Sequence, residues 1–346
     1  VNRFRSNHRY SNTLIGGKAA DALTTGKEHV VLGYNALGAE TNGVACVAIG
    51  YEALATQNGA GATNIYNTAV GYQAGKLLTT AQNCTLIGGL AGDSITTGGF
   101  NTLVGQNSGA AINTADSNAA FGNATLQTNT KSDRNTALGM NTLATLNHTS
   151  TTDAYNTAVG YQAGVSMTTG IENTLLGSQA GEALTDTDYN TAVGVAALKS
   201  DTLGARSVAV GYATLLNQNF TSATSTHNTA VGFEAGKTVT TGVQNTFVGG
   251  LAGDATDDGN YNVAIGHSAL SANCADSNTA VGTVALQIAT GANCTAVGMA
   301  AGLAATSGAN NLFLGHDAGR SGSPGGEITT GSNEIVLGDA NISEAH

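Results

Sequence analysis

One short motif recurs along the whole chain and limits how it can fold. It reads Asn-Thr-Ala-Val-Gly-Tyr-Gln-Ala-Gly at 67–75 and again, with the same nine letters, at 156–164. Its first glycine, which we call the anchor glycine, has nineteen equivalents between Gly16 and Gly338, and the commonest spacing between them is 17 residues. A fixed period of this length is typical of a solenoid, in which each repeat contacts only its neighbours.

The period changes in only a few places. It is 21 after Gly50, Gly139 and Gly211, 16 after Gly266 and Gly282, and 23 after Gly315. The longer stretches predict inserted loops at 55–66, 144–155, 216–227 and 320–333. We expect a lead-in segment over 1–10, one repetitive shaft over 11–338 and an exit segment over 339–346.

Aligned on the anchor glycine at position 0, the repeats show fixed columns. Positions −1 and −2 are apolar in all nineteen repeats, position −3 is β-branched in seventeen, and position −4 is Asn in thirteen. A short β-branched and apolar run bounded by Asn and Gly predicts a strand, and nothing in the repeat has the 3.6-residue period of a helix. The sequence therefore predicts an all-β fold, a parallel β-roll or β-helix of about nineteen coils.

The two faces of each predicted strand are both apolar or small. Positions −1 and −3 point to one side, and −2 and the anchor glycine to the other. One face can fill the interior of a coil, and we expect further copies of the chain to cover the other, as a homotrimer. We interpret the constant glycine as allowing close backbone approach at that contact, and the Asn column as an amide ladder. The structural anchors are best represented by three repeats: Asn67, Val70 and Gly71; Asn156, Val159 and Gly160; Asn228, Val231 and Gly232.

A second pattern concerns side-chain volume. Position +4 is Leu in some repeats, always beside a small or medium residue at −2, and Gly wherever −2 is Leu or Phe. This indicates volume compensation in one packed compartment. Where −2 is Ala and +4 is Gly, we expect the side chain at +1 to fill the space, as at Tyr72, Tyr161, Phe233 and Met299.

Composition agrees with a stacked array and excludes several classes. Of 346 residues, 48 are Gly and one is Pro, and only 10% are charged. No apolar run approaches the roughly 20 residues of a membrane span. The net charge of −11 argues against nucleic acid and anionic membrane surfaces as partners.

The repeat units resemble those of trimeric autotransporter adhesin heads, and Ser207 to Gly211 (Ser-Val-Ala-Val-Gly) is the closest match. They look still more like the shaft repeats of bacteriophage tail fibres and tailspikes that end in a self-cleaving intramolecular chaperone. In those proteins the last repeat reads like 333–339 and is followed by a segment like 342–346. The resemblance implies a β-roll or β-helix assembled as a homotrimer. The chaperone's own Ser-Asp signature is absent from this sequence.

Residues that often carry chemistry are better explained by the repeat. Cys46, Cys84 and Cys294 occupy the Asn column, and we expect them to be small substitutes in the ladder rather than disulfide partners. Ser268 and Lys237 fall in repeat columns that only imitate nucleophile and phosphate-loop motifs. We interpret the acidic clusters Asp254, Asp257 and Asp258, and Asp186 and Asp188, as solvated loop charge, with loop calcium as the alternative. The sequence predicts no catalytic residue, cofactor or metal.

These observations favour a non-enzymatic fibre shaft of a phage tail fibre or tailspike, located in a virion tail appendage or otherwise extracellular. The expected partners are two further copies and other virion components at the N-terminal end. Contact with a host-surface glycan or protein receptor, if the shaft makes any, is expected at the inserted loops. Three alternatives stay open: the head of a bacterial trimeric adhesin, a self-stacking extracellular filament, and an ice-binding surface built on the Thr column.

Overall fold

The computed structural model describes residues 4–7, 10–59, 64–324, 326–339 and 341–342. It confirms the predicted class: the chain is an all-β parallel β-solenoid of about 18 turns with about 17 residues per turn. The nineteen anchor glycines enclose eighteen intervals, so the nineteen expected coils correspond to nineteen ladder strands joined by about 18 turns. Below, a coil is named by its anchor glycine.

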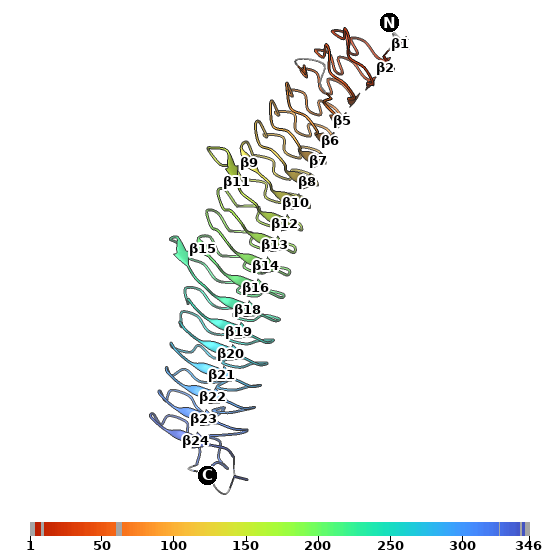
Figure 1. Ribbon diagram of the computed structural model, residues 1–346. Coiled ribbons are helices and arrows are strands. Elements are labelled where there is room, and N and C mark those ends of the chain that lie inside the picture. The colour runs from red at the N-terminus through yellow and green to blue at the C-terminus, as the bar shows by residue number, and fades with distance from the viewer. Residues whose placement is uncertain (1–3, 8–9, 60–63, 325, 340, 343–346) are drawn as a thin grey trace. The chain divides into compact units, whose positions relative to one another are not determined.

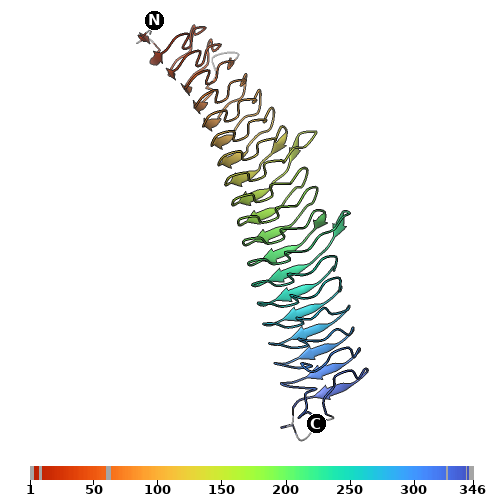
Figure 2. The same cartoon turned by 180° about the vertical axis from the view of Figure 1, so that it is seen from behind.

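The chain contacts divide into two compact units, Val1–Asn173 and Thr174–His346. In the first unit the ladder strands lie side by side in chain order, as Figures 1 and 2 show. They are β2 (Asn12–Ile15), β3 (Val30–Leu32), β4 (Val47–Ile49), β5 (Thr68–Val70), β6 (Thr85–Ile87), β7 (Thr102–Val104), β8 (Ala119–Phe121), β10 (Thr136–Leu138) and β12 (Thr157–Val159).

The second unit repeats this arrangement with ten ladder strands (Figure 1). They are β13 (Thr174–Leu176), β14 (Thr191–Val193), β16 (Val208–Val210), β18 (Thr229–Val231), β19 (Thr246–Val248), β20 (Val263–Ile265), β21 (Thr279–Val281), β22 (Thr295–Val297), β23 (Leu312–Leu314) and β24 (Ile335–Leu337). Each strand covers positions −3 to −1 of its coil, which are the positions that the sequence predicts.

Adjacent ladder strands pair in parallel and in register. In β6 and β7, for example, Thr85 lies opposite Thr102 and Leu86 opposite Leu103. One strand breaks the rule: β1 (Phe4–Asn7) pairs with β2 in antiparallel orientation. The strand edge at the start of the ladder is therefore occupied by a strand that does not continue the parallel pattern.

The interior of the coils is built from alternate strand positions. Position −2 is fully buried in the middle of each unit, whether it is Ala69, Leu103 or Phe247, and so is the Asn at position −4. Positions −3 and −1 point outward instead and stay half-exposed. Of the two strand faces, −2 and −4 thus form the core, and −3 and −1 form the outer face.

The volume compensation operates between neighbouring coils. A Cβ built on Gly75 would lie 2.6 Å from Leu86 Cδ1 of the next coil and 2.9 Å from Leu54 Cδ2 of the preceding one. Gly236 has the same relation to Phe247 and Leu215. The space that a side chain at +4 would occupy is therefore filled from two directions. The Leu at +4 of the preceding coil fills it from one side, and the large residue at −2 of the next coil fills it from the other.

The interpretation of the anchor glycine as an intermolecular contact is wrong, because its cause lies within the chain. Gly105 has φ +134°, and a Cβ there would lie 2.3 Å from the carbonyl oxygen of Gly122 in the next coil. Gly71 and Gly88 show the same relation at 2.3 Å. Anchors such as Gly71 and Gly105 thus need both a backbone conformation that side chains disfavour and room for the next coil's carbonyl.

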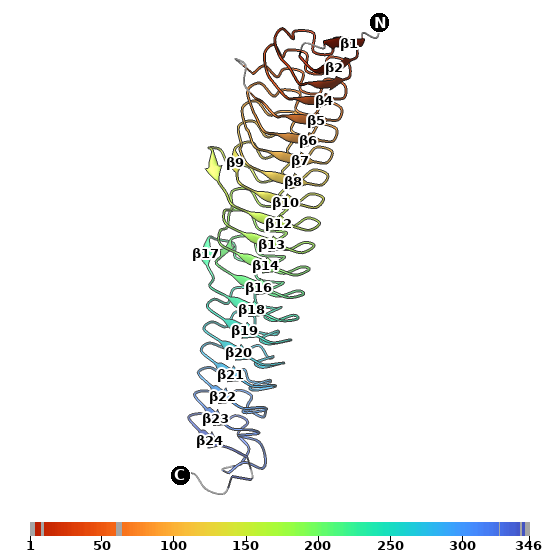
Figure 3. The same ribbon diagram turned by 45° about the vertical axis from the view of Figure 1, so that its right-hand side comes forward.

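Two of the inserted loops each pair with the turn before them and so form a small ladder beside the main one. In the first unit β9 (Ser132–Asp133) pairs in parallel with β11 (Thr152–Asp153). In the second unit β15 (Gly204–Ala205) pairs in parallel with β17 (Thr224–Ser225). Figure 3 shows each small ladder standing out from the stack of its own unit.

Candidate functional site

The Asn residues singled out from the sequence tie consecutive turns together. Asn67 is fully buried; its Nδ2 donates to the carbonyl oxygen of Ala81, 2.8 Å away, and its Oδ1 accepts from the N–H of Cys84, also at 2.8 Å. Asn156 and Asn228 are buried in the same way and donate to Gly170 and Gly242. Each side chain thus satisfies two buried main-chain groups. These hydrogen bonds contribute more to stability than exposed ones, because a buried group that lost its partner could not bond to water instead.

The amide ladder expected from the Asn column needs correction. Most of these side chains bond to main chain, and amide-to-amide bonds are few and long, such as Asn118 Nδ2 to Asn101 Oδ1 at 3.3 Å. In a Cys coil the thiol replaces only the donor: Cys84 Sγ lies 3.5 Å from Gly98 O, and Cys294 Sγ 3.3 Å from Gly308 O. All four cysteines are buried and free.

The outer face of the strands is a surface that the solenoid itself leaves uncovered. It consists of the side chains at −3, −1 and +1 of successive coils, and we call it the outer strip. From the Gly16 coil to the Gly315 coil these three columns contain no Lys, Arg, Asp or Glu. Val159 and Val231, two of the sequence-predicted anchors, belong to it and are each 37% exposed. An uncharged strip with regularly spaced, exposed apolar side chains is a candidate interaction surface.

The prediction for position +1 is wrong. Tyr72, Tyr161, Phe233 and Met299 do not fill the coil interior; they are exposed on the outer strip. The interior space is already filled by neighbouring coils, and the turn at the anchor glycine directs position +1 outward. In the first unit Tyr34, Tyr51 and Tyr72 form a stacked ladder with ring centroids 5.6 and 5.4 Å apart.

A further outward column stands at position −5, two residues before each strand. Every residue there adopts a left-handed conformation, with φ between 50° and 64°. Five of them are exposed aromatic residues, for which this conformation is strained: Tyr66, Phe100, Tyr155, Tyr189 and Tyr261. Charged residues join them, and the guanidinium of Arg134 lies 5.7 Å from the Tyr155 ring centroid. The outer strip is therefore bordered by a mixed aromatic and charged rim.

The sequence analysis missed a buried polar column at position +7. It is apolar in most coils, as at Leu78, but beside the first and third inserted loops it holds Glu40 and Gln57, and Asp201 and Gln218. Glu40 Oε1 accepts from the N–H of Gly43 at 2.7 Å, and its Oε2 accepts from Gln57 Nε2 at 3.2 Å. Part of the signal was available, because Gln57 and Gln218 stand at +7 in two of the three coils with the 21-residue spacing. The third has Leu146 there, and the buried Asn129 stands at +7 of the coil before it.

The second of these pairs is built like the first. Asp201 accepts hydrogen bonds from the N–H groups of Gly204 and Phe220 and from Gln218 Nε2. Gln218 in turn donates to Ser207 Oγ and accepts from Asn228 Nδ2 at 2.8 Å. Burial raises the pKa of Asp201 above its ordinary value despite these bonds. These carboxylates hold the main chain where the inserted loops leave the regular coil.

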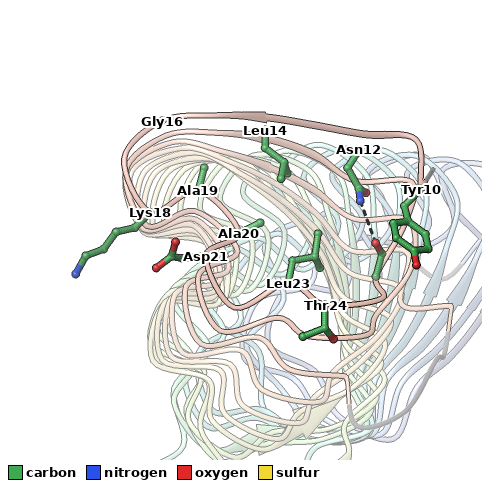
Figure 4. Close-up of a pocket in the computed structure, with 11 residues that line it drawn as sticks. Tyr10, Asn12, Leu14, Gly16, Lys18, Ala19, Ala20, Asp21, Leu23 and Thr24 are labelled. Carbon is green, nitrogen blue, oxygen red and sulfur yellow. Dashed lines mark hydrogen bonds between the residues drawn. The ribbon is translucent and has the colours of Figure 1, made fainter. Parts of the chain in front are cut away.

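A hollow opens at the first coil. Tyr10, Asn12, Leu14 and Leu23 line it, as Figure 4 shows, and Gly26 also belongs to its lining. These are the side chains that, in later coils, lie between two turns; Leu14 and Leu23 are only half-buried here, whereas Leu103 and Leu78 are fully buried. The hollow is thus the uncovered end of the core column, and its polar group Asn12 is already bonded to Gly26 O at 2.9 Å.

The acidic clusters stay on the loop side of the coils. Asp257 accepts from Thr240 Oγ1, and burial raises the pKa of the half-buried Asp254. Asp186 is exposed. Within the described residues no three His, Cys, Asp or Glu side chains come together as metal ligands. Over the same ranges no helix is long and apolar enough to cross a membrane.

No protein-family model matches the chain, and no curated protein matches it. The fold class is therefore defined by the chain's own geometry, as a β-solenoid repeat protein of about 18 turns.

Proposed function

We propose that this chain is the shaft of a phage tail fibre or tailspike and that it works, without enzymatic activity, as a homotrimer in a virion tail appendage. The observation that carries the proposal is the outer strip, which is uncharged over the coils from Gly16 to Gly315 on a chain of net charge −11. For a single chain, leaving regular columns of Val, Ile and Tyr exposed to water is unfavourable in free energy.

A second copy fits this strip better than an unrelated partner does. The strip repeats once per coil, and another copy presents the same step along its whole length. Like-charged chains repel, so two copies can approach closely only where neither carries charge. The column at −5 then lies at the rim of the interface, where polar and charged side chains are common. It includes Glu28, Arg134, Glu172 and Arg206.

The area on offer supports a stable assembly. An aromatic side chain buries 150–250 Å² when fully covered, so a half-exposed one retains roughly 100 Å². In the first unit Tyr34, Tyr51, Tyr72, Phe121 and Tyr161 are about half exposed on the strip and together offer roughly 500 Å² on that basis. The aliphatic column at −1 adds to this, and stable interfaces need about 800 Å² per partner.

The other expected contacts follow from the same arrangement. With the outer strip covered, the inserted loops and the small ladders β9–β11 and β15–β17 remain open to a host-surface glycan or protein receptor. The N-terminal end is where we place contact with other virion components. The head of a bacterial trimeric adhesin would use the same strip and remains the alternative. A self-stacking filament is disfavoured by the antiparallel β1, which does not offer a parallel edge to a further coil.

One observation favours a second candidate. The Thr column at −3 is half-exposed in the single chain, so Thr68, Thr85 and Thr102 form a regular outward row. A flat Thr row of this kind is what an ice-binding surface needs. Covering the strip with further copies would remove this function.

The test combines mass and location. We expect native mass spectrometry of the whole chain to show three copies, and gold-labelled antibody against it to mark the tail appendages of phage particles. Label on bacterial surfaces but not on virions would overturn the phage-fibre proposal in favour of the adhesin head. A single-chain mass together with inhibition of ice recrystallisation would overturn the trimer in favour of ice binding.

A further inference from the structure

Two glycines on the outer strip have no reason within their own chain. A Cβ on Gly89 would meet nothing within 4 Å, and one on Gly250 would meet only ordinary contacts at 3.7 and 4.0 Å. Neither has the positive φ that excludes side chains. Both stand at position +1, which is Tyr, Phe or Met in many other coils. Nothing within their own chain therefore requires these two residues to be small.

Exposed aromatic residues recur at a fixed distance from these positions. Phe100 follows Gly89 by eleven residues, and Tyr261 follows Gly250 by the same number. A third pair, Ser178 and Tyr189, has the same spacing. Each aromatic residue stands at −5, in the coil after the small residue, and is strained: φ is 57° at Phe100 and 59° at Tyr261. Phe100 is 63% exposed, so packing within its own chain does not explain it either.

We infer that these residues form a knob-and-notch contact between copies, in which Phe100, Tyr189 and Tyr261 of one copy fit into the gaps at Gly89, Ser178 and Gly250 of its neighbour. Within one chain the knob precedes a strand and the notch follows one, so they border opposite sides of the outer strip. Two copies side by side bring one copy's knobs to the other's notches. The inference rests on the proposed homotrimer and names the contact that would hold it.

The heights of the residues fit a ring of equivalent copies. A turn of about 17 residues rises about 4.8 Å, so eleven residues correspond to roughly 3 Å of rise. In a neighbouring copy held at the same level, each knob therefore lies between the notch, roughly 3 Å below it, and the next +1 side chain, roughly 1.7 Å above it, and no progressive shift that would prevent closure of the ring is needed. The next side chain of the +1 column, Gln106 in the case of Phe100, then lies above the knob.

The contact also removes two local costs at once. An exposed aromatic ring loses its contact with water, and a left-handed conformation that is unfavourable for Phe or Tyr is held in place by packing. Asn83 and Ser117 stand at −5 where the residue eleven positions earlier is Tyr72 or Gln106 rather than a small residue. Tyr66 and Tyr155 are aromatic at −5 without a small +1 residue in the coil before them, so the contact concerns three coils and not the whole column.

Disulfide trapping tests the contact in the full chain. The double variant Gly89→Cys/Phe100→Cys should give covalent dimers and trimers on a non-reducing gel after mild oxidation, because the native cysteines are buried and free. The control Gly89→Cys/Ser117→Cys moves the second thiol one coil further, beyond disulfide reach of about 7 Å. It should give only the uncrosslinked chain.

A volume swap gives an independent measurement. Gly89→Phe should lower the thermal midpoint at which the oligomer dissociates, without changing the circular dichroism of the folded chain. Gly89→Phe/Phe100→Gly should restore most of that loss. Three-copy assemblies without trapping in the Phe100 pair, or with equal trapping in the Ser117 control, would overturn the knob-and-notch contact and leave the homotrimer standing. A single-chain mass would overturn both.

Discussion

At the scale of single residues, the solenoid depends on groups that satisfy the main chain of a neighbouring turn. Asn at −4 does this twice, with a donor and an acceptor, whereas the thiol of a Cys coil offers only a weak donor. Burial raises the pKa of Cys84 to about 11, so the thiol stays protonated and donates at neutral pH. The Cys coils are therefore the places where the column is weakest.

The first prediction is that Cys84→Asn stabilises the chain. The new amide should donate to Gly98 O and offer its carbonyl to the N–H of Asn101, as Asn67 does for its own neighbours. Net hydrogen bonds of this kind contribute about 1 kcal/mol each, so the urea midpoint should rise. Cys274→Asn is the control, because Cys274 is buried against Thr256 outside the Asn column and should tolerate no amide. A lower midpoint for Cys84→Asn would contradict the role of the column.

The second prediction compares two glycines one coil apart. Gly105→Ala should cost at least about 3 kcal/mol, since it combines a disfavoured φ with a clash against the next coil's carbonyl. Gly89→Ala should change the free energy of unfolding of the single chain by less than about 1 kcal/mol, because a Cβ there meets no atom of its own chain. Equal losses in the two variants, measured by urea unfolding, would show that the anchor column is not special.

At the scale of the element, consecutive coils are not interchangeable. A Leu at +4 packs over the glycine of the next coil, and the buried pairs Glu40–Gln57 and Asp201–Gln218 each join two particular turns. If the stacking slipped by one coil, the carboxylate would face apolar side chains and would lose the hydrogen bond that it accepts from the glutamine of the neighbouring turn. These pairs therefore specify which turns stack, a role in which buried polar groups are best attested.

The third prediction concerns pH. Burial raises the pKa of Asp201 in the folded chain above its unfolded value, so its neutral form is favoured by folding. Its contribution to stability is present in full below the unfolded pKa of about 3.9 and is lost as the pH rises through the folded pKa. The stability of the wild type relative to Asp201→Asn should therefore be greater at pH 4 than at pH 7. An equal difference in thermal midpoint between the wild type and Asp201→Asn at the two pH values would contradict this prediction.

The strands could be predicted from the sequence and several corners could not. Thr-Ala-Val between Asn and Gly predicts a strand, and β5, β12 and β18 lie at the predicted positions. The left-handed corners were missed because nothing about Tyr66 or Leu90 favours that conformation; stacking on both sides imposes it. Tyr72 was placed inside because it is apolar, although the direction of its side chain depends on the turn before it.

At the scale of the whole molecule, the question is what covers the outer strip. The fourth prediction is that Val159→Lys or Val231→Lys reduces the native mass to one chain and leaves the circular dichroism unchanged. Each side chain already reaches water, so the solenoid can accept the charge, but an interface would have to bury it. Leu77→Lys, at an exposed turn position off the strip, should keep the mass of the assembly. Unchanged mass in the Val variants would place the contact elsewhere.

The in-register pairing of successive turns has a mechanical consequence. Each turn is joined mainly to the turns before and after it, so a chain pulled from one end should give way one turn at a time. At 3.3–3.6 Å per extended residue, a 17-residue turn releases roughly 55–60 Å of length and a 21-residue turn roughly 70–75 Å. A force-extension trace from an optical trap would then read out the sequence periods as a series of short steps interrupted by longer ones.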